Sequence, residues 1–260
     1  MTPAPVAPAF DTGLVLPDAL AGFADVAPAI LDERALQQRV DRKYLLPMRL
    51  LDPLLAQLRG DYGVLRSAGR LAASYNTRYF DTPDRRFYED HRRGRRPRHK
   101  VRVRHHLDRE LTFLETKKKG ADERTLKART SRPFGHTDLD AVARAFVAQH
   151  CPIPANLLVP RLSIAFRRLT LVGEHINERV TFDWDFALEE DGRRDEWPAV
   201  VIAEVKQARY DNRTPSTRAF RTLGIREFPI SKYCLATARL APVRSHPFKP
   251  ALRAVEHLSA

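Results

Sequence analysis

Charged and apolar residues alternate along two neighbouring stretches near the middle of the chain. Side chains of a β-strand point to opposite faces with a period of two, so each stretch predicts a strand with one charged face and one apolar face. The Leu107–Arg109 segment between them predicts a hairpin connection. The alternating charges are Lys100, Arg102 and Arg104 in the first stretch, and Glu115, Lys117 and Lys119 in the second.

Two later stretches repeat this pattern. In Arg179–Phe186, the apolar residues Val180, Phe182, Trp184 and Phe186 alternate with polar ones. Val200–Lys206 begins with four apolar residues and ends with Glu204 and Lys206 on one side of a predicted strand. Whole strand faces are therefore charged while their opposite faces are apolar.

Turn residues and helix caps bound the other elements. Asp52 and Pro53 predict the start of a helix that ends at Gly60. A basic loop is expected over residues 91–98. We also expect strands over 39–46, 73–81 and 161–171, a helix from Thr137 to Cys151 with Leu139, Val142 and Phe146 on one face, and a helix from Thr214 to Gly224.

The chain divides into three parts by composition. Residues 1–28 are rich in alanine and proline, which predicts a mobile leader with an optional short helix near Phe23. Residues 242–260 form a tail with prolines and no clear pattern. Residues 29–241 predict one α+β domain with about eight antiparallel strands interrupted by helices.

Charged strand faces allow two arrangements. The common one places the apolar face inward and leaves the charges in water. The other is a closed sheet, an eight-stranded antiparallel tunnel or barrel, whose lumen is polar and basic and whose apolar outside is covered by helices. Such a lumen would hold a multiply charged anion.

Composition narrows the class of partner. The 260 residues contain 45 Lys and Arg against 32 Asp and Glu, a formal net charge of +13. This surplus favours an anionic partner, which could be a nucleotide, polyphosphate, nucleic acid or anionic lipid. The two cysteines, Cys151 and Cys234, make no metal-binding spacing and favour a reduced, cytosolic protein. No apolar run is long enough for a membrane span, and the N-terminus lacks the pattern of a signal peptide.

The charged strands also have a structural interpretation. A solvated basic face, or pairing of Glu115 with arginine on the adjacent strand, would explain them without a ligand. The functional alternative is phosphate binding, since arginine offers a rigid fork of donors and lysine a mobile point charge.

Glu204 is the leading candidate for a metal ligand. A carboxylate in so apolar a strand is costly unless it is paired or metal-bound, so an ion pair with arginine and metal ligation stay open alternatives. Asp41, Asp183 and Glu115 are further candidates. Oxygen ligands without histidine or cysteine favour Mg²⁺ or Mn²⁺. Lys232, taken alone, fits a surface lysine.

Taken together, these segments resemble the VTC domain family, the polyphosphate-polymerase-like branch of the triphosphate tunnel metalloenzymes. No single motif is specific, but their order and spacing extend over residues 38–238. The matching segments are Arg39-x-Asp41-x-Lys43-Tyr44, Tyr79-Phe80-Asp81-Thr82, Lys100-x-Arg102-x-Arg104, Glu115-x-Lys117, Phe166-x-Arg168, Arg179-x-Thr181-Phe182-Asp183, Glu204-x-Lys206 and Ser231-Lys232-Tyr233.

The resemblance implies roles for named residues. Catalytic contacts to phosphate would come from Lys43, Arg102, Arg104, Lys117, Arg168 and Lys232. Further phosphate contacts would come from Arg39, Lys100, Lys119, Arg179 and Lys206. The metal, Mn²⁺ or Mg²⁺, would be held by Glu204, with Asp41 and Glu115 assisting.

Three positions depart from the family pattern. Asp41 stands where glutamate is usual, and its shorter side chain would reach a metal through water. Phe166 replaces a tyrosine and so lacks a hydroxyl. Arg39 stands at the first position of the tunnel signature Glu-x-Glu-x-Lys, which favours the VTC branch over tripolyphosphatase and thiamine-triphosphatase relatives.

We therefore expect a metal-dependent phosphotransferase that moves a phosphoryl group from ATP to a polyphosphate chain. Hydrolysis of triphosphate or polyphosphate in the same tunnel is one alternative. A non-catalytic sensor that binds polyphosphate or nucleotide for a membrane or envelope partner is another. Nucleic-acid binding is disfavoured, since valine rather than aromatic residues separates the charges. We expect a cytoplasmic location, at the inner membrane face if a membrane protein recruits the chain.

Overall fold

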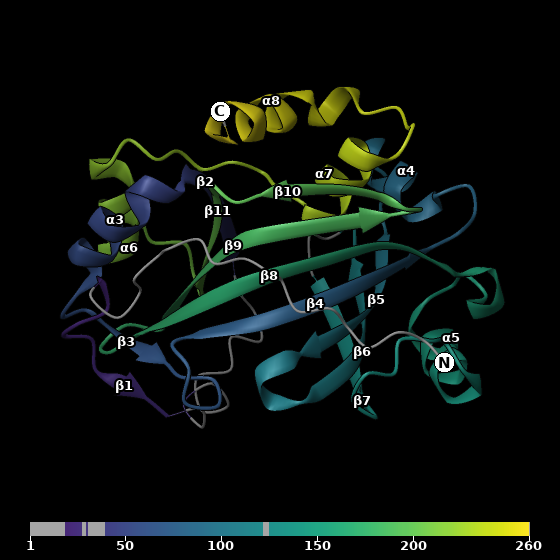
Figure 1. The fold of residues 1–260 in the computed structure, drawn as a ribbon, viewed down its shortest axis with the longest axis horizontal. Helices are drawn as coiled ribbons and strands as arrows, with labels where there is room; N and C mark the ends of the chain where they lie inside the picture. The colour runs from purple at the N-terminus through teal and green to yellow at the C-terminus, as the bar shows by residue number, and fades with distance from the viewer. Residues whose placement is uncertain (1–18, 28–29, 31–39, 122–124, 260) are drawn as a thin grey trace.

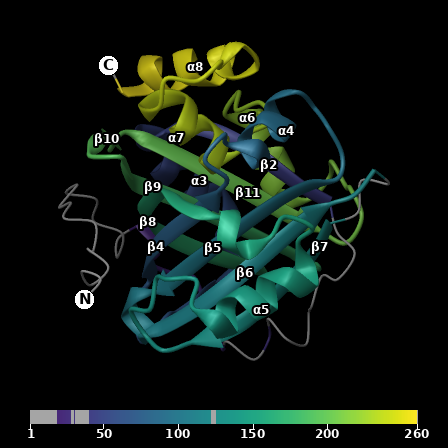
Figure 2. The same ribbon diagram turned by 90° about the vertical axis from the view of Figure 1, so that its right-hand side faces the viewer.

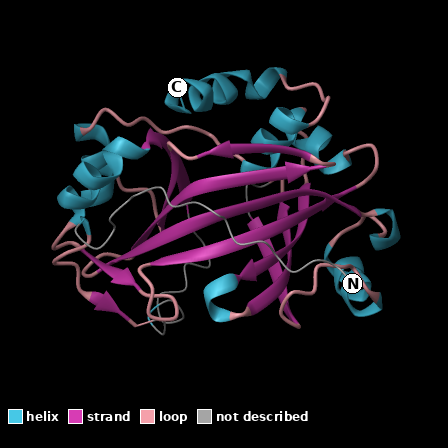
Figure 3. Cartoon of the chain, in the orientation of Figure 1, coloured by secondary structure: helices cyan, strands magenta, loops and turns pink. Residues whose placement is uncertain are grey.

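A long, mostly antiparallel sheet forms the centre of the molecule (Figure 1). The computed structural model describes residues 19–27, 30, 40–121 and 125–259. The secondary structure of this part is shown in Figure 3. Its strands are β1 (Asp25–Val26), β2 (Val40–Pro47), β3 (Tyr62–Leu65), β4 (Ala72–Asp81), β5 (Arg98–His106), β6 (Leu111–Lys119), β7 (Thr125–Arg132), β8 (Val159–Gly173), β9 (Glu178–Glu190), β10 (Arg193–Trp197) and β11 (Val200–Gln207).

The main path of the sheet runs β2-β11-β9-β8-β4-β5-β6-β7. Off this path, β10 pairs with β9, β3 pairs with β8, and β1 runs parallel to β3. The path has two ends, β2 and β7, and the described strands include no pairing that joins them. The predicted antiparallel sheet with helices is confirmed in outline, whereas the predicted closure into a barrel is not observed.

Helices cover the apolar face of the sheet. The longer ones are α3 (Leu51–Leu58), α4 (Arg86–Arg92), α5 (Ala141–His150), α6 (Pro215–Thr222), α7 (Lys232–Leu240) and α8 (Lys249–Ser259). Short 3-10 turns lie at Met48–Leu50, Leu107–Arg109, Ala155–Leu157 and His246–Phe248.

Three apolar clusters join these helices to the sheet. Val180, Phe182 and Trp184 of β9 are fully buried with leucines of α3 and Phe220 of α6. Val101 and Val103 of β5 pack in a second cluster with α5, which lies along β6 in Figure 2. The third contains α7 and α8. The apolar sides of the charged strands therefore face helices, as the alternation predicts.

Several elements differ from the sequence-based expectation. Helix α4 overlaps the first residues of the segment 91–98, where the sequence predicts a basic loop. The helix forms because buried Asp81 accepts the N–H groups of Phe87 and Tyr88 in its first turn. Helix α8 lies in the tail, where no element is expected. Within the expected mobile leader, Leu20 is buried and β1 pairs with β3. Strands β3, β7 and β10 are also additional to those expected.

Helix α5 keeps part of its expected buried face, since Leu139 is buried and Phe146 packs against the same cluster, but Val142 does not join them. Asp140, not Thr137, caps its N-terminus by accepting the backbone N–H of Ala143. Ala143 and Val147 are its buried residues, while Val142 is 70% exposed. The buried face runs through Leu139, Ala143 and Val147, at the i, i+4, i+8 spacing of one helix face, and Val142 lies to one side of it.

Two further findings concern the sequence-based expectations. Cys151 and Cys234 are buried and carry free thiols. In the part of the chain that the structure describes, no helix is both long and apolar enough to span a bilayer.

Candidate phosphate-binding site

The charges of seven strands lie on one face of the sheet, which we call the charged face. Residues directly opposite each other in an antiparallel pair point to the same side. Arg102 lies opposite both Glu115 and Tyr79, and Glu204 lies opposite both Lys43 and Thr181. The other opposed charged-face pairs are Lys100 with Lys117, Lys206 with Arg179, Lys206 with Asp41, Arg168 with Asp183, and Lys117 with Lys127.

The start of α7 links distant strands of this face. The Lys43 Nζ in β2 donates to the Ile230 carbonyl at 2.9 Å, and the Lys100 Nζ in β5 donates to Ser231 Oγ at 2.9 Å. Five pairings separate β2 from β5 along the sheet. Two lysines from distant strands therefore converge on adjacent residues, which requires the sheet to curl around the charged face.

The surroundings of Lys117 show the same curl. Burial first, and then repulsion from Lys100 and Lys43, lower the pKa of Lys117 to about 8. In about 0.1 M salt, charges act on one another over roughly 10 Å. Lys117 lies on β6, near one end of the sheet path, and Lys43 lies on β2 at the other end. The two ends of the sheet thus face each other across the charged side.

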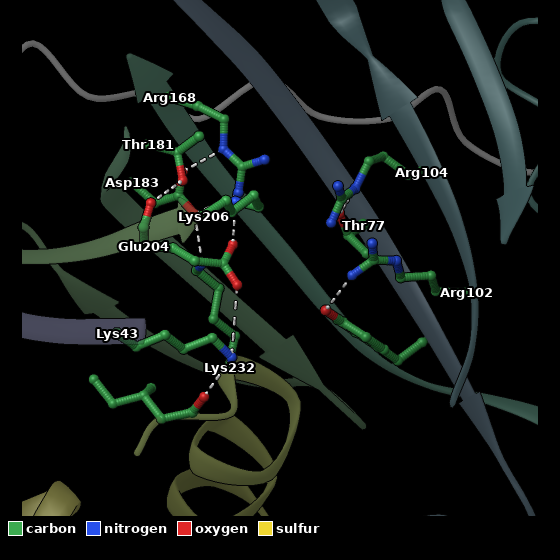
Figure 4. Close-up of polar contacts among 12 residues, drawn as sticks. Lys43, Thr77, Arg102, Arg104, Arg168, Thr181, Asp183, Glu204, Lys206 and Lys232 are labelled. Atoms are coloured by element: carbon green, nitrogen blue, oxygen red, sulfur yellow. Dashed lines mark hydrogen bonds and ion pairs between the residues drawn. The ribbon is translucent and has the colours of Figure 1, made fainter. Parts of the chain in front are cut away.

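Glu204 is held by lysines in this structure. Its carboxylate lies 2.6 Å from the Lys206 Nζ and 4.0 Å from the Lys43 Nζ (Figure 4). Burial would raise the pKa of Glu204, but Lys206 and Lys43 hold it well below its ordinary value. The residue is thus an anion with two cationic partners, which are lysines rather than the expected arginine.

Asp183 forms a second ion-pair centre. The Arg168 Nε and Nη2 donate to its two oxygens at 2.5 and 2.7 Å, and the Lys232 Nζ also donates to it. Although burial opposes ionisation, Arg168 and Lys232 lower the pKa of Asp183 to about 2. The side chain of Lys232 is only 20% exposed, so it is not a surface lysine.

Glu115 is the third centre. It accepts from Arg102 at 2.6 Å and from Lys127 at 2.5 Å, and it lies 4.0 Å from Arg104. Burial acts against ionisation, yet Arg102, Arg104 and Lys127 hold the pKa of Glu115 well below its ordinary value. The Arg102–Glu115 pair is the cross-strand contact considered as a structural explanation. In Figure 4 the guanidinium groups of Arg102 and Arg104 point toward the Glu204 and Asp183 centres.

Lys127 on β7 is a site residue that the sequence analysis missed. A signal was present, because Lys127, Arg129 and Ser131 alternate with Leu126, Ala128 and Thr130. The second set is weakly apolar, so the alternation is less distinct than in β5. The pairing of β7 with β6 brings Lys127 onto the charged face.

The structure places the predicted site residues in three groups. Asp41, Lys119 and Arg179 occupy charged-face positions by register. Arg39 lies outside the described residues. The residues that share ion pairs, hydrogen bonds or direct electrostatic influence are Lys43, Lys100, Arg102, Arg104, Glu115, Lys117, Arg168, Glu204, Lys206 and Lys232.

The oxygen donors fit one type of metal site. Among the residues that the structure describes, no group of three or more His, Cys, Asp and Glu side chains could hold a metal. A cage made only of protein is therefore not formed there. Mg²⁺ commonly binds through one or two carboxylates together with waters and substrate phosphates. Glu204 fits that arrangement. Asp41 lies on the adjacent strand, opposite Lys206 and two residues before Lys43, which is opposite Glu204. Glu115 is already paired with Arg102 and Lys127.

Comparison with known proteins identifies the family. The sequence model of the VTC domain matches residues 38–241, which include every described residue of the charged face. The chain belongs to the VTC domain family. No curated protein matches the sequence of this VTC domain.

Solved structures with a similar course of the chain share little sequence with this VTC domain. A Hippeastrum protein, described as an adenylyl cyclase with a dominant triphosphatase activity, has 13% identity and a TM-score of 0.47, covering 79% of this chain and 98% of its own. A conserved hypothetical protein from Pyrococcus furiosus has 13% identity and a TM-score of 0.43, with coverages of 75% and 98%. The PH1012 protein from Pyrococcus horikoshii has 12% identity and a TM-score of 0.39, with coverages of 80% and 97%.

Proposed function

We propose that this VTC domain binds ATP and inorganic polyphosphate on its charged face and transfers a phosphoryl group from ATP to the polyphosphate chain. The observation that supports it best is the convergence of cations from β2, β5, β6, β8, β11 and α7. These cations outnumber the four carboxylates that neutralise them in part, which are Asp41, Glu115, Asp183 and Glu204. A multiply charged anion would supply the missing negative charge.

Phosphoryl transfer matches what such a face can supply. In the reaction, the bond between the γ-phosphorus and the bridging oxygen of ADP breaks, and a terminal oxygen of polyphosphate forms the new bond. The protein must hold both oxygens in line and stabilise the charge on the transferred group. Arg102, Arg104 and Arg168 would fix phosphate oxygens, while Lys232 would stabilise the transferred group. The acceptor phosphate is already ionised, so no base is required.

The proposal includes a divalent cation, Mn²⁺ or Mg²⁺. Glu204 would hold it, together with phosphate oxygens, and the ion would neutralise part of the phosphate charge. Lys206 and Lys43, which pair with Glu204 in this structure, could then turn to the phosphates. Asp41 and Glu115 as additional ligands stay a prediction.

Two other functions use the same face. Hydrolysis would need water as acceptor, and a sensor would bind the anion without turnover. Nucleic acid fits less well, because the side chains of Lys206, Lys232 and Arg104 are only 12%, 20% and 11% exposed. A duplex cannot reach cations so far below the surface.

The test is incubation of the purified chain with ATP and Mn²⁺, followed by a polyphosphate gel and a phosphate assay. We expect polyphosphate on the gel and one ADP formed for each phosphoryl group added to it. Lys232→Ala should lower kcat by at least about tenfold, which is about 1.4 kcal/mol, with a modest change in ATP affinity. Lys232→Arg keeps the charge with a different geometry and should recover little.

The outcomes separate the three functions. Free phosphate without polymer would favour the hydrolase. Binding of ATP and polyphosphate without turnover would favour the sensor. Wild-type turnover by Lys232→Ala would remove the role assigned to that lysine. Arg193→Ala serves as a control, since the Arg193 Nη1 donates to the Leu240 carbonyl away from the charged face.

A further inference from the structure

Three aromatic rings form a set at one end of the charged face, and we call Tyr75, His106 and Phe113 the aromatic set. The centroids of Tyr75 and His106 lie 4.6 Å apart, and those of His106 and Phe113 lie 5.4 Å apart, both edge to face. All three side chains are partly exposed. Rings that served only to fill the interior would be buried as Phe166 is, at 1% exposure.

Strand register places this set beside the phosphate-binding cations. Tyr75 lies opposite His106, and Phe113 lies opposite Arg104. The guanidinium of Arg104 is 5.6 Å from the ring of Tyr75, and that of Arg129 is 5.2 Å from the ring of Phe113. The rings therefore lie on the charged face, directly next to its arginines.

The opposite end of the same row lies at α7. On β5 the charged-face positions run from Lys100, which bonds to Ser231, through Arg102 and Arg104 to His106. Six residues of strand span about 20 Å. The charged face thus has a lysine-rich end at α7 and an aromatic end at Tyr75 and Phe113. An anion with different groups at its two ends would bind in one direction.

We propose that the aromatic set is the subsite for the base of a nucleoside triphosphate, whose phosphates extend from Arg104 toward α7. This inference rests on the proposed function. It adds a contact to the base, which ATP has and inorganic triphosphate lacks. Flat nucleobases stack on aromatic side chains and on arginine planes. Burial, followed by repulsion from Arg104, lowers the pKa of His106 to about 3, so its ring is neutral near pH 7. A neutral ring can stack on a base without adding a further charge to the arginine cluster.

Titration with ATP and with inorganic tripolyphosphate, at the same Mg²⁺ concentration, tests the subsite. Phe113→Leu keeps an apolar side chain but removes the flat ring. We expect this change to weaken ATP binding by about fivefold or more, as for the loss of one base–ring stack, and tripolyphosphate binding by less than about twofold. Tyr75→Leu should act in the same direction.

Phe134→Leu is the matched control. Phe134 is 44% exposed and packs edge to face on His105, whose side chain lies on the other side of β5. This variant should leave both affinities unchanged. Thermal unfolding of each variant shows whether the fold is kept, and Phe113→Tyr, which retains a ring, should retain ATP binding if the loss in Phe113→Leu is a loss of stacking.

Each remaining outcome decides the matter. Equal losses for ATP and tripolyphosphate in Phe113→Leu would overturn the subsite, as would unchanged ATP binding. Either result leaves the proposed function standing, provided that tripolyphosphate binds to the wild type. Binding of neither ligand by the wild type would overturn the proposed function and the subsite together.

Discussion

Asp183 shows how one buried carboxylate can organise two cations. It is 1% exposed and pairs with Arg168 and Lys232, which come from β8 and α7. A buried charge is costly without partners, and removing one member of such a set leaves the others uncompensated. Asp183 therefore keeps both cations extended over the charged face before any anion binds. Phosphate would find them already oriented, which lowers the entropy cost of binding.

The pKa of Lys117 gives a pH-dependent prediction. At about pH 8 half of the Lys117 side chains are neutral in the free protein, and an anion binds the protonated form. Below pH 8 the lysine is already charged. Above it, binding must take up a proton, so affinity falls as pH rises. We expect tripolyphosphate affinity to drop by up to about tenfold between pH 7 and pH 9.

Lys117→Arg is the control for this prediction. Arginine stays charged throughout the range, so the ratio of wild-type to variant affinity removes the titration of the ligand and of the other lysines. This ratio should fall with pH. A ratio that stays constant from pH 7 to pH 9 would show that Lys117 does not contact the anion or that its pKa lies far above 8.

At the scale of elements, α7 connects the charged face to the rest of the fold. Ser231 caps the helix by accepting the N–H of Cys234, and it also accepts from Lys100. Tyr233, the second residue of α7, donates its hydroxyl to Asp81 at the end of β4. Asp81 also accepts two N–H groups at the start of α4. One carboxylate thus fixes α7 against α4 and thereby positions Lys232.

Removal of the Tyr233 hydroxyl should loosen this connection. Tyr233→Phe leaves the ring in place but takes one donor from buried Asp81. We expect a loss of about 1–3 kcal/mol in the free energy of unfolding, the cost of one buried hydrogen bond to such a group. Chemical denaturation measures it. Tyr210→Phe, at a ring that is 47% exposed, should cost nothing measurable. Equal stability of both variants would contradict the role of Asp81.

At the scale of the whole molecule, the net charge of +13 is distributed unevenly. Part of it lies on exposed side chains, such as Arg95 in the loop after α4, which is 60% exposed, and Arg194 in β10, which is 77% exposed. Another part lies on the charged face, where most of the cationic side chains are half-buried. Salt screens exposed charges strongly and half-buried ones weakly. The two sets should therefore respond differently to ionic strength.

Salt titration separates the two sets. Raising NaCl from about 0.15 M to about 0.5 M should lower tripolyphosphate affinity by less than about tenfold, because its cations are half-buried. Duplex DNA, which can reach only surface cations, should lose more than about a hundredfold if it contacts six phosphates. Fluorescence anisotropy with labelled ligands measures both. Equal salt dependence of the two ligands would place the phosphate site on the outer surface.

Local patterns determined much of this fold. Strands β5, β6, β9 and β11 follow from alternation, and α6 from its proline start and glycine end, because these signals act between neighbouring residues. Helix α3 ends before Gly60 as expected but begins at Leu51, ahead of the expected start at Asp52 and Pro53. Strand β7 was missed because its outer face is weakly apolar. Helix α4 was missed because its first turn is fixed by Asp81, a contact that depends on the folded chain.

The sequence by itself determined the chemistry of the charged face, since the period of two assigns each lysine, arginine and glutamate to one side of its strand. Only the tertiary structure decided how these strands meet. Lys43 and Ile230 are 187 positions apart, yet they share a hydrogen bond. Three other features also depend on how distant segments meet. They are the pairing of Asp183 with Lys232, the contact of Lys127 with Glu115, and the position of the aromatic set beside Arg104. Curl arises from contacts between distant segments, which no local pattern encodes.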